Sequence, residues 1–567
     1  MTPREIPAPL VERARQPGFT PGRRDIGALL DLIVELGADR DDDVRAVERA
    51  LSRRAELALP AALERLGLPA GDATDDGRGD ARLLRLVGRA AAGADPDARD
   101  GASRAVAAAL ADERARVRRQ AALALARTGG AGAEDSLLAA WQGEAELTVR
   151  RALASALGRI GGARAVAALR AELPGAIDPE LRRLLERAIL TAGRTIDRGS
   201  PDRAASAIDG EARPPAPLPV LLRCRAGLER LLAAELSAGG WTVRAVAPGR
   251  VETVLAGPLA SLFHLRLHTG FAFPLAPRTG PAARAVVDAL ASPEAGAVLS
   301  KFTRGAVRFR IEWERGGHRR GEVWRIAGEI AARRPDLVND PTDSTWHVRV
   351  AEDGEGHGDG GRVQIALEPR KLDDPRFAYR VAEVPAASHP TVAAALARLS
   401  VVHSLAPAGD VVWDPFVGSG LELCERGRLA PSRRLAGSDV NPDALAAARA
   451  NLDAAGVAAE LVAADALGLD IEDVTVILTN PPMGRRVLRG HARPLLVRVV
   501  DRAAALLPPG GLLCWISPIP GETRARAAAL GLRLEDAHPI DMAGFAAEIQ
   551  VLRAEQKKGR ARQHRRR

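Results

Sequence analysis

The chain has 567 residues, 46% of them hydrophobic and 27% charged, a balance typical of soluble globular proteins that excludes a collagen-like or wholly disordered chain. The length predicts roughly three or four domains, and three widely spaced cysteines without a Cys-x-x-Cys pair exclude a zinc finger and a disulfide scaffold. The formal net charge is +9, but residues 557–567 hold seven cations and no acid, which leaves only +2 for the rest of the chain.

The N-terminal segment has no apolar run of the kind that secretory signals contain. The longest apolar stretch, near residues 503–520, is broken by Pro508, Pro509, Gly510 and Gly511, so it is unsuited to span a membrane. We therefore expect a cytoplasmic protein without a membrane segment.

An internal repeat marks residues 1–200. The sequence Val-Arg-Arg at 117–119 recurs at 149–151 and, as Leu-Arg-Arg, at 181–183, in steps of 32 residues. Apolar residues at helical spacing follow each copy, and a Gly-Gly pair then stops the helix in the first two copies. A fixed period of this length predicts an α-solenoid, which resembles the short HEAT-like repeat. The resemblance implies a scaffold for a partner protein, with at least three copies and degenerate ones at 25–110.

The recurring arginine pairs have two interpretations. They could form a ladder of phosphate contacts, or they could pair with acids of the neighbouring repeat such as Glu113, Glu146 or Glu180. We favour pairing with acids, because charges on helix surfaces usually form a solvated face.

A Pro- and Ser-rich linker is predicted at 201–217, and the pattern then changes to alternating strands and helices. In residues 218–380 we expect strands at 220–224, 242–246, 250–255, 307–311, 346–350 and 362–367, and helices at 227–236, from 259, and at 321–333. The loop around His357 contains several acids, but we interpret it as a solvated loop and predict no metal site.

From residue 401 the chain becomes regularly α/β, which predicts a parallel sheet with helices between its strands. Strands are expected at 410–416, 435–440, 459–464, 474–479 and 511–517, with two closing strands at 531–540 and 547–554.

Chemistry-bearing residues follow four of these strands in order. A glycine-rich turn over 414–420 lets the backbone approach a ligand, but its G-x-G-x-x-G pattern is incomplete, which disfavours a dinucleotide. Asp439 ends the next strand and suits a carboxylate that binds ribose hydroxyls. Asp465 follows the third strand, and Asn-Pro-Pro-Met at 480–483 follows the fourth.

These four elements together resemble the Rossmann-like class I methyltransferases that use S-adenosylmethionine, in the branch that methylates amines. The resemblance assigns Asp439 to the ribose, Asp465 to the adenine, and Asn480 to both the cofactor and the target. It assigns the methionine part of the cofactor to the first turn, through Asp414, Pro415, Phe416, Gly418 and Gly420.

The Asn-Pro-Pro segment has a physical rationale for an exocyclic amine, whose lone pair is delocalised into the base. The side-chain oxygen of Asn480 and the carbonyl of Pro481 can accept its two hydrogens, which directs the lone pair toward a methyl donor, while Pro481 and Pro482 hold these acceptors rigid. Met483 stands where the family has an aromatic residue that stacks on the base. Its sulfur can still pack on a ring, although it could instead fill a gap in the core.

Residues 218–380 resemble the ferredoxin-like module and THUMP domain that precede RNA guanine-N2 methyltransferases, and residues 381–556 the catalytic domain of that family. In the bridge between them, Thr391 is expected either to contact the methionine carboxylate or only to begin a helix. The resemblance implies tRNA as the substrate, or large-subunit rRNA. Residues 557–567 form a basic tail that would attract RNA. Contacts with backbone phosphates could come from Arg304, Arg308, Arg310, Arg319, Arg320 and Arg325, or these residues could be ordinary strand and helix surface.

Two rival interpretations remain open. The Asn-Pro-Pro motif also serves enzymes that methylate adenine N6 or protein glutamine. Alternatively, Met483 marks a degenerate site, and the chain is an RNA-binding scaffold without catalytic activity.

Overall fold

The computed structural model describes residues 8–66, 76–130, 132–199, 205–315, 319–353, 361–385, 387–469, 471–483, 492–542 and 544–556. The predicted loop around His357 and the basic tail at 557–567 lie outside the described residues. The chain forms two compact units, one of residues 1–204 with 327–332 and one of residues 205–326 with 333–567. Within the described residues, no helix combines the length and the hydropathy that a bilayer crossing requires.

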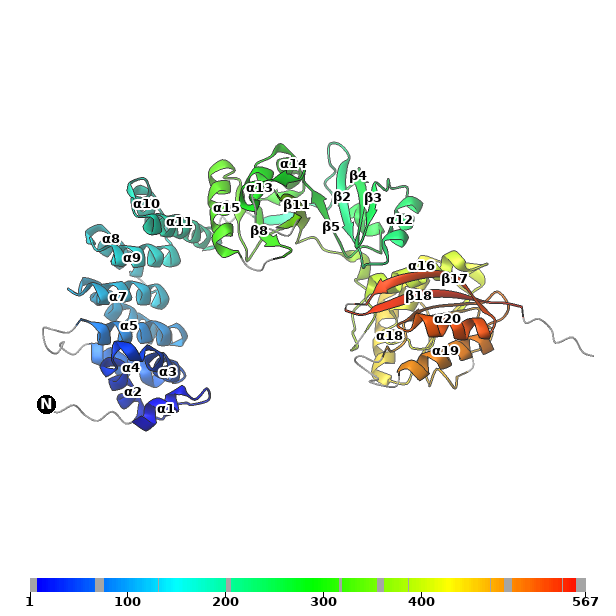
Figure 1. Ribbon diagram of the computed structural model, residues 1–567, viewed down its shortest axis with the longest axis horizontal. Helices are drawn as coiled ribbons and strands as arrows, with labels where there is room; N and C mark the ends of the chain where they lie inside the picture. The colour runs from blue at the N-terminus through cyan, green and yellow to red at the C-terminus, as the bar shows by residue number, and fades with distance from the viewer. Residues whose placement is uncertain are drawn as a thin grey trace, which may run out of the picture. The chain divides into compact units, whose positions relative to one another are not determined.

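The first unit is a stack of helices (Figure 1). They are α1 (Ala8–Arg15), α2 (Arg23–Glu35), α3 (Asp41–Ser52), α4 (Ala55–Leu66), α5 (Arg78–Ala90), α6 (Pro96–Ala108), α7 (Ala115–Thr128), α8 (Ala133–Gly143), α9 (Leu147–Ile160), α10 (Ala163–Glu172) and α11 (Pro179–Gly199). Helices α5, α7, α9 and α11 pack successively against one another, and we call them the long row; α4, α6, α8 and α10 form the second row. The predicted helical solenoid is confirmed, including helix pairs in the segment where degenerate copies were expected.

The 32-residue period reflects a repeated contact of the first arginine of each pair. Arg118 donates to the main-chain carbonyl of Asp112 at 2.9 Å, and Arg150 makes the same bond to Glu144 at 2.9 Å. Arg182 bonds the carbonyl of Ala176 at 2.8 Å. In each repeat the guanidinium thus satisfies a backbone acceptor in the turn before its own helix.

The arginine pairs also bind acids, as we favoured from the sequence. Arg118 forms an ion pair with Glu144 at 2.8 Å, and Arg151 binds Asp178 at 2.8 Å and Glu180 at 2.5 Å. These guanidiniums are therefore engaged within the solenoid.

The second unit contains two sheets. The larger has the strand order β3-β4-β2-β5-β11-β10-β8-β9, with β6 added beside β11. Its strands are β2 (Leu218–Arg223), β3 (Ala245–Ala247), β4 (Arg250–Leu255), β5 (Gly270–Pro274), β6 (Arg278–Thr279), β8 (Val307–Trp313), β9 (Leu337–Asn339), β10 (Trp346–Asp353) and β11 (Arg362–Pro369). Its helices are α12 (Glu229–Ala238), α13 (Ala282–Leu290), α14 (Pro293–Lys301) and α15 (Arg320–Arg333), and the segment Leu259–His264, expected to be α-helical, is a 3₁₀ helix.

Part of the predicted linker belongs to this unit. Strand β1 (Ser206–Ile208) pairs antiparallel with β7 (Thr303–Gly305). Asp209 beside it binds Arg304 at 2.7 Å. Residues 205–217 are therefore tied to the α/β unit rather than forming a free spacer.

The second sheet has the order β14-β13-β12-β15-β16-β18-β17. Its strands are β12 (Val411–Asp414), β13 (Arg434–Asp439), β14 (Glu460–Ala463), β15 (Val476–Thr479), β16 (Leu512–Ser517), β17 (Leu532–Asp541) and β18 (Ala546–Ala554). The first five are parallel, and β18 inserts antiparallel between β16 and β17. Every strand expected from the sequence is present.

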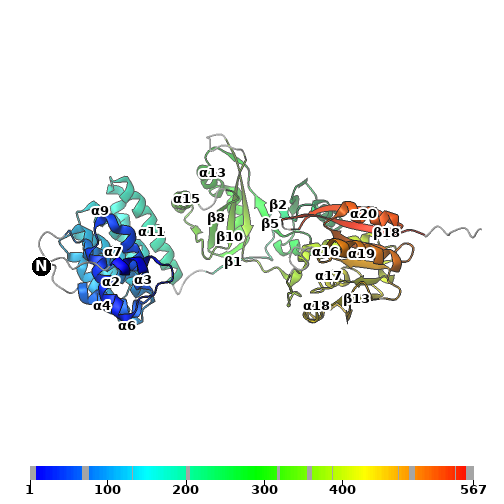
Figure 2. The ribbon, with the colours of Figure 1, turned by 60° about the horizontal axis from the view of Figure 1, so that its bottom comes forward.

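Two groups of helices accompany this sheet (Figure 2). Helices α16 (Pro390–His403), α17 (Leu421–Leu429) and α18 (Pro442–Ala455) pack in series, and α19 (Ala492–Leu506) packs against α20 (Pro520–Ala529). The buried indoles of Trp413 and Trp515 lie in the core on the α19–α20 side. Glu425 in α17, also buried, receives two 2.6 Å bonds from Arg266, which joins the two sheets of this unit.

The closest helix packing in the solenoid yields a stability prediction. A methyl group on Gly158 in α9 would lie 2.5 Å from the Cα of Ala188 in α11, so Gly158→Ala must separate the two helices. We expect a loss of about 1–3 kcal/mol, measured as faster hydrogen exchange in α9 and α11 peptides. The matched control is Gly193→Ala in α11, where a methyl group meets no atom within 4 Å and should stabilise the helix by about 0.5–1 kcal/mol. Equal exchange in the two variants would contradict the prediction.

Candidate active site

The carboxyl ends of the parallel strands bring the predicted residues to one edge of the second sheet. Asp414 ends β12 and is paired in register with Gly437 of β13, whereas Asp439 ends β13 opposite Ala463 of β14. Asn480 directly follows β15, the neighbour of β12 on its other side. Crevices for ligands in open α/β sheets lie outside this edge.

The glycine-rich turn crosses this edge with two residues in the left-handed region. Gly418 has φ 49° and Gly420 has φ 79°, conformations that glycine adopts without strain. The amide of Gly418 donates to the Asp439 carboxylate at 3.1 Å, so the turn after β12 is anchored on the end of β13. A methyl group on Gly418 would meet only one atom, at 3.9 Å, which leaves its surface open to a ligand.

Asp414 is fully buried at the base of the turn. One carboxylate oxygen accepts bonds from the hydroxyl of Thr479 at 2.6 Å and the amide of Phe416 at 3.0 Å. The other oxygen is buried and has no partner among the described residues. Burial, reinforced by the nearby carboxylate of Glu422, raises the pKa of Asp414 well above its ordinary value.

The side chain of Ser388 connects Asn480 to a second buried acid. The amide nitrogen of Asn480 donates to the hydroxyl oxygen of Ser388 at 2.8 Å, and Ser388 donates to the carboxylate of Glu422. Because the single hydroxyl hydrogen of Ser388 goes to Glu422, the group facing its oxygen must be a donor. The side-chain oxygen of Asn480 is therefore left over, buried and without a partner in the described part of the chain.

Glu422 and Ser388 were not predicted as site residues. Glu422 lies in the first turn of α17 and is buried; burial raises the pKa of its carboxyl. In the sequence it has the pattern of an ordinary helix-start acid. Only its packing against the segment before α16 shows that it belongs to this network.

The two remaining acids serve as turn acceptors in the structure. The second Asp439 oxygen accepts from the amide of Asn441 at 2.9 Å, and the exposed Asp465 accepts from the amide of Leu467 at 3.0 Å. Val440, between Asp439 and Asn441, is 73% exposed. A large apolar side chain left in solvent at this edge is the feature that sequence reasoning missed.

Thr391 is the second residue of helix α16. It is 1% exposed, and its hydroxyl bonds the Nδ1 atom of His389, the N-cap residue, at 2.8 Å. Burial and the neighbouring arginines, Arg225 first, lower the pKa of His389 to about 4, so the ring is neutral at physiological pH and can accept from the helix start.

The other predicted residues differ in exposure. Pro415 and Pro481 are buried, whereas Phe416, Pro482 and Met483 are partly buried. Among the described residues, no cluster of three or more metal-binding side chains occurs.

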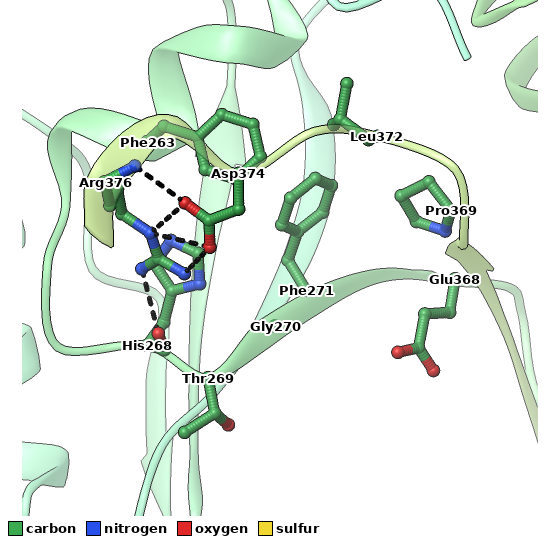
Figure 3. Close-up of a pocket in the computed structure, with 10 residues that line it drawn as sticks. All are labelled: Phe263, His268, Thr269, Gly270, Phe271, Glu368, Pro369, Leu372, Asp374 and Arg376. Carbon is green, nitrogen blue, oxygen red and sulfur yellow. Dashed lines mark hydrogen bonds and ion pairs between the residues drawn. The ribbon is translucent and has the colours of Figure 1, made fainter. Parts of the chain in front are cut away.

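A separate cavity of about 150 Å³ lies beside the larger sheet (Figure 3). Arg376 closes one side of it, donating to the Asp374 carboxylate and, at 2.9 Å, to the carbonyl of His268. Burial lowers the pKa of His268 to about 3, so this ring is neutral. The charged side chains of Asp374 and Arg376 bind each other, so we assign no catalytic role to this cavity.

The prediction that six arginines contact RNA phosphates is corrected in part. Arg308 is 1% exposed and lies 3.7 Å from the Asp340 carboxylate, so it is a core residue. Arg304 and Arg319 bind Asp209 and Glu352 at 2.7 and 2.6 Å. The alternation of side chains along β8 does not reveal that Arg308 is buried, because Arg308 lies on the same face of the strand as Arg310, which is partly exposed. Arg320 and Arg325 are exposed.

Comparisons with known proteins agree with this geometry. Residues 378–519 match the family model UPF0020, described as an RMKL-like methyltransferase domain. This segment is therefore similar to a methyltransferase domain, in agreement with the methyltransferase expected from the sequence. Residues 86–189 match HEAT repeats, as expected for the solenoid.

Two relatives extend the comparison. A tRNA (guanine(10)-N2)-dimethyltransferase of Methanothermobacter thermautotrophicus is 34% identical over 127 residues, which are 22% of this chain and 37% of that protein's length. The crystal structure of TrmN from Thermus thermophilus is 26% identical, covers 59% of this chain and 99% of its own, and gives a TM-score of 0.46.

The buried Asp414 carboxyl predicts a pH dependence of stability. Its raised pKa means that the folded chain keeps a proton that the unfolded chain loses above about pH 4, so this group lowers stability as the pH rises. Asp414→Asn cannot ionise, and its stability should fall less between about pH 5 and pH 8 than that of the wild type, by about 1–2 kcal/mol. Urea unfolding followed by tryptophan fluorescence measures this difference.

The control for this experiment is Asp453→Asn, which removes the same charge from an exposed position on α18. Its pH profile should follow that of the wild type. An unchanged profile in Asp414→Asn would show that the carboxyl is ionised in the folded chain.

Proposed function

We propose that this chain is an S-adenosylmethionine-dependent RNA methyltransferase that acts on an exocyclic base amine, guanine N2 of tRNA. One observation carries the proposal: the side-chain oxygen of Asn480 is a buried acceptor without a partner among the described residues, held at the carboxyl edge of a methyltransferase sheet. The guanine-N2 activity of the Methanothermobacter relative supports the choice of amine.

The residues at the edge fit the proposed cofactor. Asp414 would lose its proton as the α-ammonium group of the cofactor binds, and its unpartnered oxygen would then accept from that group. The open surface at Gly418 admits the methionine part. In this proposal Asp439 binds the ribose hydroxyls, Asp465 binds the adenine amine, and Val440, which is exposed, packs on the face of the adenine ring. When bound, S-adenosylmethionine supplies an electrophilic methyl group on a sulfonium centre.

The protein then contributes orientation rather than strong base chemistry. The side-chain oxygen of Asn480 and the carbonyl of Pro481 accept the two hydrogens of the amine, so the lone pair points along one direction. Ser388 and Glu422 hold the Asn480 amide in the orientation that presents its oxygen. Met483 is partly exposed next to the motif, where its sulfur can pack on the target base.

The other parts of the chain serve RNA binding in this proposal. Residues 218–380 form a ferredoxin-like and THUMP module, and residues 381–556 the catalytic domain. This division is supported by the two sheets of the second unit. Along the chain, β11 is the last strand of the larger sheet and β12 is the first strand of the second sheet.

The direct test is methylation of undermodified tRNA with labelled cofactor, followed by mass spectrometry of the nucleosides. We expect N2-methylguanosine with the wild type, and a kcat lower by about 10²–10³-fold with Asn480→Ala, because an oriented acceptor is lost. Cofactor affinity in calorimetry should stay within about two-fold in the variant. If N6-methyladenosine were the only product, the target would be adenine N6 instead. Micromolar cofactor binding without any methylated base in tRNA or rRNA would reject the proposed activity.

Ser388 provides a second prediction about orientation. Ser388→Ala leaves the Asn480 amide without its hydrogen-bond acceptor and lets it rotate, so we expect kcat to fall by about 10-fold with little change in KM for the RNA. Ser388→Thr keeps the hydroxyl and should restore most of the rate. A rise in KM with unchanged kcat would show that Ser388 acts in binding instead.

A further inference from the structure

Three consecutive helices of the long row carry an arginine in the last turn. These are Arg89 in α5, Arg127 in α7 and Arg159 in α9, and all three side chains are exposed. Arg127 and Arg159 are 32 residues apart and hold the same position in successive repeats. They are distinct from the arginine pairs at the helix starts, which the solenoid itself engages.

The packing of the helices lines up these three residues. Helix α7 lies between α5 and α9 (Figure 1). A methyl group on Gly88, next to Arg89, would lie 2.9 Å from the Cα of Ala124 in α7, so the two helices approach closely. Because packed helices have axes about 8–10 Å apart, the positions of these arginines on neighbouring helices recur at about that spacing. We call Arg89, Arg127 and Arg159 the arginine ladder.

The ladder has little compensating charge. Helices α7 and α9 contain no acid at all. Glu48 of α3 is fully buried and binds Arg85 at 2.6 Å and Arg89 at 3.2 Å. No ion pair is found for Arg127 or Arg159 within the described residues. On α8, which packs against α9, Asp135 is engaged by Arg164 and Glu134 by the amide of Ala165.

Helix stability alone is a weak reason for this arrangement. A cation near a helix C-terminus gains about 0.3–1 kcal/mol at an exposed site, but neighbouring cations oppose that gain. Partial burial and the guanidiniums of Arg89, Arg159 and Arg85 lower the pKa of Arg127. The solenoid therefore holds these like charges together, with Glu48, which is bound by Arg85 and Arg89, as their internal counterion.

We propose that the arginine ladder binds the phosphate backbone of the RNA substrate, as an anchor apart from the catalytic domain. Guanidiniums bind phosphates in a bidentate manner and release counterions, and a line of them at regular spacing suits a polyphosphate strand better than a single acidic side chain. This inference rests on the proposed function only in taking RNA as the substrate. It assigns the solenoid a nucleic-acid partner in place of the protein partner expected from the repeat.

The test compares two double variants of the full chain that remove equal charge. Arg127→Gln with Arg159→Gln removes two rungs and leaves the pairs of Glu48 intact. Arg104→Gln with Arg170→Gln, on α6 and α10 of the second row, changes two exposed arginines for which the structure shows no ion pair among the described residues. Binding of a labelled tRNA transcript is followed by fluorescence anisotropy over a range of salt concentrations, and thermal unfolding confirms that both variants fold.

We expect the ladder variant to bind about 10-fold more weakly, with a slope of log K against log salt reduced by about 1.4–1.8 for two lost phosphate contacts. The control variant should stay within about two-fold of the wild type. Equal affinities and slopes in the two variants would overturn the proposal. Weakened binding of an acidic protein with unchanged RNA binding would assign the surface to a protein partner instead.

The outcome can be separated from that of the proposed function. Asn480→Ala should bind the transcript as the wild type does, since that residue is proposed to contact the target amine and not a phosphate. Loss of RNA affinity in the ladder variant without any methylated product in the wild type would reject the enzyme and retain the anchor. Methylation by both double variants with the same KM for tRNA would retain the enzyme and reject the anchor.

Discussion

The buried carboxylate of Asp414 holds together the part of the molecule on which the site depends. Through Thr479 it joins the ends of two central parallel strands, and through the amide of Phe416 it sets the start of the turn that follows. Burial removes water from this group and favours its protonated form, and its second oxygen has no internal partner in the described chain. The sheet thus keeps an unsatisfied polar group where a cationic group is proposed to bind.

The amide of Asn480, which would face the substrate, likewise has one polar atom without an internal partner in the described chain. Asn480 uses its donor internally, on Ser388, and keeps its acceptor unused. Residues that leave polar groups unpaired in a core reduce stability, and natural proteins accept this cost at functional sites. The apolar core around Trp413 and Trp515 supplies stability that offsets this cost, as do buried ion pairs such as that of Arg426 with Asp410 at 3.0 Å.

Charge has different uses along the chain. At the helix starts of the solenoid, arginines bond carbonyls of the preceding turn and pair with acids of the next repeat, so their charges are compensated within the stack. At the helix ends, Arg127 and Arg159 lack such partners among the described residues. The net charge of the body is near zero, so its distribution, rather than its sum, indicates where an anionic partner would bind.

The sequence by itself determined the solenoid, the order of the strands along the chain and the four elements at their ends, because periodicity and turn residues are local properties of the chain. It could not reveal Glu422 and Ser388, which lie 34 residues apart and meet through packing. Nor could it show that Arg308 is buried, or that the segment after residue 205 forms a strand with β7. Only the tertiary structure decides which polar atoms are satisfied, since a hydrogen-bond partner distant in sequence leaves no pattern in the residues themselves.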